Sequence, residues 1–242
     1  MSAQAAAEIV RVYVWEVPVR ITHWLIALSI VVLSATGLYI GHPFLIVSGE
    51  ARQHFVMGWA KAIHMYTAYA FMASVVARII WMFTGNKYAH WDKFIPVRPE
   101  RRRALWPTLK FYLFALRKPP GFVGHNPLAG ATYTLVFWLY VVAMATGLVL
   151  RSANADVGSL IRHFAVLAPI LGGLQTARWV HHATMWLLLG FAVHHVYSSV
   201  LMSTIEANAT VESIFSGHKF VPREDLEFSG YRFINRRQEI DE

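Results

Sequence analysis

Four long apolar runs dominate the pattern of hydrophobic and polar positions along the chain. They extend over about residues 21–40, 58–83, 128–150 and 179–205, and a helix needs roughly 20 apolar residues to cross a bilayer. Lipid offers no hydrogen-bond partner to backbone amides, and the runs are too long for the strands of a membrane barrel. The fold class expected is therefore all-α, an integral membrane four-helix bundle that forms a single domain over residues 1–242.

Lysine and arginine in the connections predict the orientation of the chain. Nine of them lie in the loop 84–127 and five in the tail 206–242, whereas the other two connections hold few. Cytoplasmic loops of membrane proteins carry this excess, so the basic loop, the tail and both termini are expected in the cytoplasm. The N-terminal segment lacks the apolar core of a signal peptide, so the first span is expected to remain in the mature protein.

Composition narrows the possible chemistry. The chain is 56% hydrophobic and only 15% charged, and its net charge of +8 is concentrated beside the spans. This distribution favours contact with anionic lipid and not with nucleic acid. Cysteine is absent, which excludes disulfides, thiolate-held iron–sulfur clusters and covalently attached haem. Histidine, with 12 copies, is the candidate ligand for a redox centre.

Histidines within the spans form the candidate site, because ionisable residues inside a membrane indicate function by default. His181 and His195 are 14 positions apart and so share one helix face, about 21 Å apart along the axis. The predicted topology places His64 at the depth of His181 and His23 toward that of His195. Two cross-helix pairs are expected: His64 with His181 on the outer side, and His23 with His195 on the inner side.

Two histidines at each of two levels suit two haems with both axial positions filled, which transfer electrons and have no open site for oxygen. Zinc or copper would need three or four ligands at one level. The alternative is that the intramembrane histidines only form hydrogen bonds between helices. The mixed pairs His182/His195 and His181/His194 point to nearly opposite sides of the helix. His182 and His194 are therefore expected to pack or to support the ligands.

Three further residues in the spans have two interpretations each. Arg78 could bind a haem propionate, or its side chain could extend to the membrane interface. Gly37 and Gly147 could allow close approach of haem, or of a neighbouring helix.

Several motifs together resemble the cytochrome b subunit of membrane-bound nickel–iron uptake hydrogenases, a two-haem prokaryotic cytochrome b family. They are Arg20-Ile21-Thr22-His23-Trp24, the stretch Gly49 to Trp59, Gly124-His125-Asn126-Pro127, and Arg178-Trp179-Val180-His181-His182 with Trp186. The similarity covers nearly the whole chain, from about Val14 to the tail.

The resemblance implies a function. Proteins of this family anchor the small and large hydrogenase subunits on the outer face of the bacterial inner membrane. They pass electrons from hydrogen through an outer and an inner haem b to quinone. Carried over by position, the axial ligands would be His23, His64, His181 and His195, in agreement with the spacing argument. The quinone site is expected at the inner end, near His23 and the basic loop.

Two other functions compete with this one. The chain could be the two-haem cytochrome b of another quinone-linked dehydrogenase, such as formate dehydrogenase, or a stand-alone quinone-linked cytochrome b. A copurifying partner would discriminate between these. A non-redox anchor or transporter subunit would be colourless, and the absence of aspartate and glutamate from the span interiors argues against a transporter.

Overall fold

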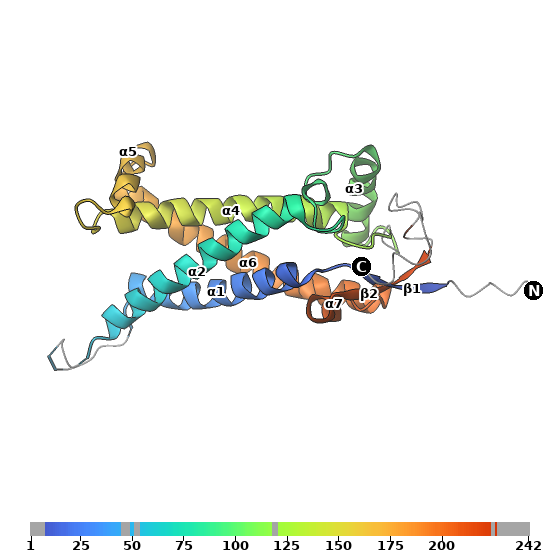
Figure 1. Ribbon diagram of the computed structural model, residues 1–242, viewed down its shortest axis with the longest axis horizontal. Helices are drawn as coiled ribbons and strands as arrows, with labels where there is room; N and C mark the ends of the chain where they lie inside the picture. Colours follow the sequence, from blue (N-terminus) through green and yellow to red (C-terminus); the bar gives the residue numbers. More distant parts are fainter. Residues whose placement is uncertain (1–7, 45–48, 51–53, 118–120, 224–225, 227–242) are drawn as a thin grey trace, which may run out of the picture. The chain divides into compact units, whose positions relative to one another are not determined.

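A computed structural model of the chain describes residues 8–44, 49–50, 54–117, 121–223 and 226 (Figure 1). Several basic residues that the orientation argument used lie outside this part of the chain: Arg52, Lys118, Arg232, Arg236 and Arg237.

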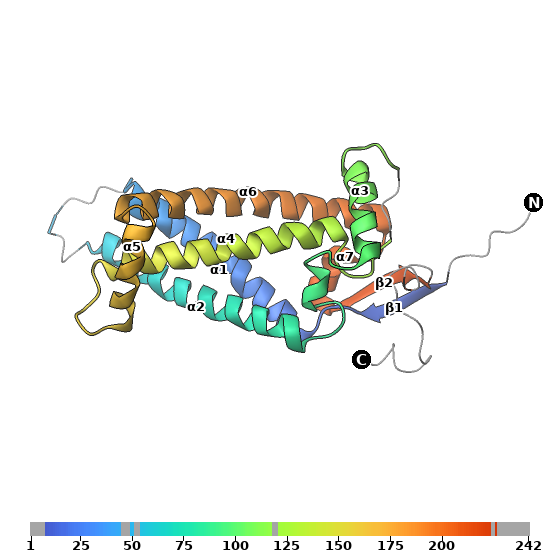
Figure 2. The ribbon, with the colours of Figure 1, turned by 90° about the horizontal axis from the view of Figure 1, so that it is seen from above.

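Four long helices account for most of the described chain (Figures 1 and 2). They are α1 (Val17–Gly41), α2 (Val56–Thr84), α4 (Pro127–Ser152) and α6 (Leu174–Glu206), and all four are long and apolar enough to cross a membrane. These helices confirm the four predicted spans, and each extends one to five residues beyond the predicted ends. Only 11–28% of the most apolar stretch of each helix is buried inside the protein, which leaves apolar side chains facing outward, as lipid contact requires.

Shorter elements connect the spans. The loop after α2 contains a 3₁₀ turn, η1 (Trp91–Lys93), and helix α3 (Pro99–Tyr112). The connection between α4 and α6 contains η2 (Leu160–Val166) and α5 (Leu167–Ile170). Helix α7 (Thr210–Ser216) follows α6. The sequence predicted the segment that contains α3 only as part of the basic loop 84–127.

A two-stranded antiparallel sheet joins the beginning of the described chain to its end. Strand β1 (Ile9–Tyr13) pairs with β2 (His218–Pro222) in a register that sets Ile9 opposite Pro222 and Tyr13 opposite His218. Both views show the two strands side by side (Figures 1 and 2). The all-α prediction did not include this sheet.

The chain divides into two compact units. Unit 1 contains residues 1–21, 78–135 and 194–242, and unit 2 contains residues 22–77 and 136–193. Each long helix contributes one part to each unit. The expectation of a single domain over residues 1–242 stays a prediction.

Unit 1 has a hydrophobic core beneath the sheet. The core is built from both strands, the segment that enters α1 and the loop after α2, and its buried side chains include Val14, Trp15, Tyr88, Val123 and Val221. The indole nitrogen of Trp15 donates a hydrogen bond to the Ser213 hydroxyl at 3.0 Å. Residues that are far apart in sequence therefore pack together beside the segment that enters α1 and the loop after α2.

Gly217, between α7 and β2, allows the sheet to close. Its φ is +85°, and a Cβ there would lie 2.5 Å from the Tyr13 ring and 2.8 Å from the Trp15 carbonyl oxygen. Its own carbonyl accepts hydrogen bonds from the amides of Val14 and Trp15 at 2.8 and 3.0 Å. Only glycine combines this backbone conformation with such a close approach.

Unit 2 contains parts of all four long helices. The rings of Phe71 on α2 and Tyr140 on α4 meet edge to face, with centroids 5.2 Å apart. Val75 on α2 and Val149 on α4 are fully buried. The predicted outer ligands lie within this packed arrangement.

Candidate functional site

His64 on α2 and His181 on α6 face each other in unit 2. Their ring centroids are 6.4 Å apart and the ring planes are inclined at 63°. Both side chains are half-buried. The structure thus brings together the two histidines that the depth argument assigned to the outer level.

Each of these imidazoles forms a hydrogen bond with a threonine on a different helix. Thr36 Oγ1 on α1 lies 2.8 Å from His64 Nδ1, and Thr146 Oγ1 on α4 lies 2.9 Å from His181 Nδ1. Since the Nδ1 atoms are engaged, the Nε2 atoms are the nitrogens left for a ligand.

A glycine follows each of these threonines and lies against the same ring. A Cβ at Gly37 would lie 3.4 Å from His64 Cε1, and a Cβ at Gly147 would lie 3.2 Å from His181 Cε1. Each glycine lets a histidine on a neighbouring helix approach its backbone. The structure therefore favours the interpretation that Gly37 and Gly147 allow close approach of a neighbouring helix.

The spacing of the two rings suits one metal atom between them. Imidazole nitrogens lie roughly 2 Å from a bound metal, so two trans imidazoles on one atom have centroids roughly 6 Å apart. Within the described ranges, no three histidine, aspartate or glutamate side chains gather as a metal site of their own. A donor set of two imidazoles fits a haem iron, whose other four positions are filled by the porphyrin.

The other members of the two histidine doublets lie in different surroundings. His182 lies against α1, where a Cβ at Gly41 would come within 2.7 Å of its Cε1 atom. His194 is exposed. These positions are compatible with the expectation that His182 packs against a neighbouring helix, whereas the supporting role expected of His194 stays a prediction.

The predicted inner ligands fall in different units, and their pairing stays a prediction. His23 belongs to unit 2, where its ring meets that of Trp24 edge to face at 5.3 Å. His195 belongs to unit 1, where its Nδ1 atom lies 3.3 Å from the hydroxyl of Tyr133 on α4. His195 thus has the same kind of contact through Nδ1 as the two outer histidines.

Arg78, in unit 1, is buried, with 7% of its surface exposed. Its guanidinium lies over the ring of Phe94, 5.2 Å from the centroid, and its Nη1 atom has no hydrogen-bond partner among the described residues. Burial argues against extension to the membrane interface. A buried guanidinium with an unused donor suits a carboxylate such as a haem propionate.

His125, just before α4, is a functional candidate that was not predicted as a ligand. Its ring contacts Trp15, Phe94 and Tyr133, with centroid distances of 4.7, 5.4 and 4.8 Å. Its Nδ1 atom is buried without a partner in the described part of the chain. The motif that carried the family resemblance included His125, but its position outside the spans gave no reason to expect this contact.

Burial lowers the pKa of His125 well below its ordinary value, and the nearby positive charges of Arg78, Lys219 and Arg101 act in the same direction. The imidazole is therefore neutral at neutral pH. Its ring packs against Tyr133, which in turn contacts His195.

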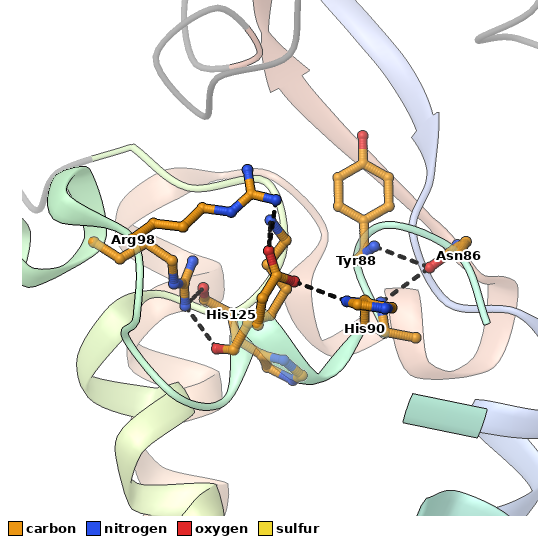
Figure 3. A network of polar contacts seen from close by, with 9 residues as sticks. Asn86, Tyr88, His90, Arg98 and His125 are labelled. Carbon is orange, nitrogen blue, oxygen red and sulfur yellow. Dashed lines mark hydrogen bonds and ion pairs between the residues drawn. The ribbon is translucent and has the colours of Figure 1, made fainter. Parts of the chain in front are cut away.

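The basic loop is organised around one carboxylate, that of Asp92 (Figure 3). His90, Lys93 and Arg98 lie 3.3, 3.5 and 2.8 Å from its oxygens, and dashed lines in Figure 3 mark the contacts of the labelled His90 and Arg98. Burial lowers the pKa of Lys93, and the carboxylate of Asp92 opposes this shift.

Arg101 connects distant parts of this loop. Its Nη2 atom donates hydrogen bonds to the carbonyl oxygens of Lys93 and His125, at 2.7 and 3.1 Å. Arg101, one of the basic residues on which the predicted orientation rests, therefore forms its hydrogen bonds inside the protein and not at the lipid surface.

The prokaryotic cytochrome b561 family matches the chain over residues 14–217. The chain is 36% identical over 213 residues to the probable Ni/Fe-hydrogenase B-type cytochrome subunit of Cupriavidus necator, which covers 86% of each protein. It is 33% identical over 231 residues to the probable Ni/Fe-hydrogenase 1 B-type cytochrome subunit of Escherichia coli K12, covering 90% of this chain and 95% of that one. A probable Ni/Fe-hydrogenase B-type cytochrome subunit of Rhizobium leguminosarum bv. viciae is 35% identical over 226 residues, covering 92% and 95%.

Four span-capable helices with facing intramembrane imidazoles define a multi-pass membrane protein that can hold a haem between its helices. The chain belongs to the prokaryotic cytochrome b561 family. This confirms the resemblance predicted from the sequence, and membership of the family implies a b-type haem.

Proposed function

We propose that this protein is the membrane-anchoring b-type cytochrome of a nickel–iron hydrogenase in the bacterial inner membrane. In this proposal it accepts electrons from the hydrogenase subunits on the outer face and delivers them to quinone. The observation that carries the proposal is the facing pair His64 and His181, with rings 6.4 Å apart on two apolar helices. The relatives named as hydrogenase cytochrome subunits support the choice of partner.

His64 and His181 would hold an outer haem b, and His23 and His195 an inner one. Haem iron supplies one-electron transfer by alternating between two oxidation states. The protein's own contribution is to fix the imidazoles, to exclude water with apolar helices and to supply charged partners. Arg78, buried with an unused donor, would bind a propionate.

The test is a spectrum of the complex purified through this chain. We expect a reduced-minus-oxidised difference typical of haem b, two haems per chain by pyridine haemochrome, and reduction by hydrogen but not by formate. His64→Ala and His181→Ala should each remove the same spectral component, and His23→Ala and His195→Ala the other.

His194→Ala is the matched control, because His194 is exposed and neighbours a predicted ligand. It should leave both components in place. Loss of the same component from His64→Ala and His195→Ala would overturn the assignment of pairs. A preparation without iron, expressed with haem available, would overturn the function itself.

A further inference from the structure

The same short run occurs in two of the long helices of unit 2. Helix α1 contains Ala35-Thr36-Gly37-Leu38 and helix α4 contains Ala145-Thr146-Gly147-Leu148. Two valines precede each run at the same distance, at positions 31–32 and 141–142. Each run places its threonine on the Nδ1 atom of one outer histidine and its glycine beside the same ring.

Each threonine hydroxyl donates its hydrogen bond to a backbone carbonyl of its own helix. Thr36 Oγ1 donates to the carbonyl oxygen of Val32 at 2.7 Å, and Thr146 Oγ1 donates to that of Val142 at 2.7 Å. The other acceptors within reach are also carbonyl oxygens, at 3.3 and 3.2 Å. A hydroxyl has one proton to donate and lone pairs with which to accept. Toward each imidazole, therefore, each hydroxyl acts as an acceptor.

This assignment fixes the tautomer of both histidines. Because the hydroxyl accepts, the Nδ1 atom must carry the proton, and Nε2 keeps its lone pair.

We propose that Thr36 and Thr146 are matched positioning residues that hold His64 and His181 with Nδ1 protonated and Nε2 directed at one iron. This inference rests on the proposed function, because it assigns residues that act on the two outer ligands. Hydrogen bonding at the far nitrogen fixes the orientation of a metal-bound imidazole and raises its basicity. The two threonines would do this from opposite sides of the same haem.

The expected consequence is a change in the redox equilibrium of one haem. A more basic imidazole stabilises the ferric state, so removing the acceptor should make the haem easier to reduce. For Thr36→Val or Thr146→Val we expect the reduction equilibrium of the outer haem to shift about tenfold toward the ferrous form. A tenfold change corresponds to about 59 mV for one electron.

The experiment is a redox titration of the purified complex, followed through haem absorbance. Thr36→Ser and Thr146→Ser keep the hydroxyl and should retain the midpoint potential of the original protein. Thr184→Val is the matched control, because Thr184 is a buried threonine of α6 in the same unit that donates to the Val180 carbonyl at 2.8 Å. It bonds no histidine within the described ranges, so its loss should leave both potentials unchanged.

The outcomes separate this inference from the proposed function. An upward shift of the same haem in both valine variants, with serine variants unshifted, supports it. Loss of that haem from the valine variants but not from the serine variants supports it equally. Unchanged potentials, a shift of two different haems, or an equal shift in Thr184→Val would overturn it. If the original protein contains no haem, the proposed function fails instead.

Discussion

Two consecutive residues on α1 and on α4, a threonine and a glycine, act differently on the imidazole beside them. The threonine supplies a hydrogen-bond acceptor, whereas the following glycine supplies space. The space is the stricter requirement on α4, where an added Cβ would lie 3.2 Å from His181, compared with 3.4 Å for Gly37 and His64. A contact at 3.2 Å forces the ring to move, because interiors of proteins are close-packed.

We therefore expect Gly147→Ala to perturb the proposed outer haem. The added methyl should push His181 away from its present position, so that haem content falls or the spectrum of that component broadens. Gly190→Ala is the control, because nothing lies within 4 Å of a Cβ built at that glycine of α6. The measurement is haem content per chain with the difference spectrum. An identical result for the two variants would show that the space beside His181 is unimportant.

At this scale the sequence predicted the histidines but not the residues that support them. Ionisable groups in apolar runs are conspicuous, and a spacing of 14 positions identifies a shared face. A threonine in a membrane helix usually bonds its own backbone, and Thr36 and Thr146 do so as well. Their second contact depends on how the helices pack, which no single segment encodes.

Among the elements, the spans were predicted well and the connecting loop was not. Apolar runs of membrane length are predictable because lipid permits so few backbone structures. Helix α3 was missed because it carries Pro107 and a cluster of charges. Its buried positions nevertheless recur at helical spacing: Arg101, Ala104, Thr108 and Phe111. The two strands were missed because each has five residues and its partner lies about 200 positions away.

The loop that contains η1 and α3 depends on the buried carboxylate of Asp92. We expect Asp92→Asn to destabilise the protein by about 3 kcal/mol, because Lys93 would remain buried without its counter-charge. The two side chains are each 8% exposed. The measurement is thermal denaturation of the purified protein in detergent at neutral pH.

Two further variants test the cause of this loss. Arg98→Gln removes a partner whose side chain is 54% exposed, so it should cost under about 1 kcal/mol. Asp92→Asn combined with Lys93→Met removes both buried charges and should recover most of the stability. A double variant no more stable than Asp92→Asn alone would show that the carboxylate acts through other contacts.

For the whole molecule, the strand pair adds a constraint on topology. Because β1 and β2 are hydrogen-bonded to each other, they must lie on the same side of the membrane, as an even number of intervening spans requires. Unit 1 likewise contains the starts of α1 and α4 and the ends of α2 and α6. The direction of insertion rests on the distribution of lysine and arginine, and we expect unit 1 on the cytoplasmic side.

Reporter fusions test this orientation. A reporter that fluoresces only in the cytoplasm should be bright after Glu242 and dark when inserted between Ser152 and Leu174. A phosphatase that is active only outside the cytoplasm should give the opposite pattern. Reversal of both patterns would refute the orientation and would place the proposed outer haem nearer the cytoplasm.

The pairing of β1 with β2 also affects the order of biosynthesis. Strand β2 leaves the ribosome about 200 residues after β1, its partner. At about 5–20 residues per second, this delay is on the order of 10–40 s. During that interval the backbone edge of β1 has no native neighbour, because the sheet can pair only after α6 has been synthesised. A stop codon before His218 would leave β1 permanently without its partner strand.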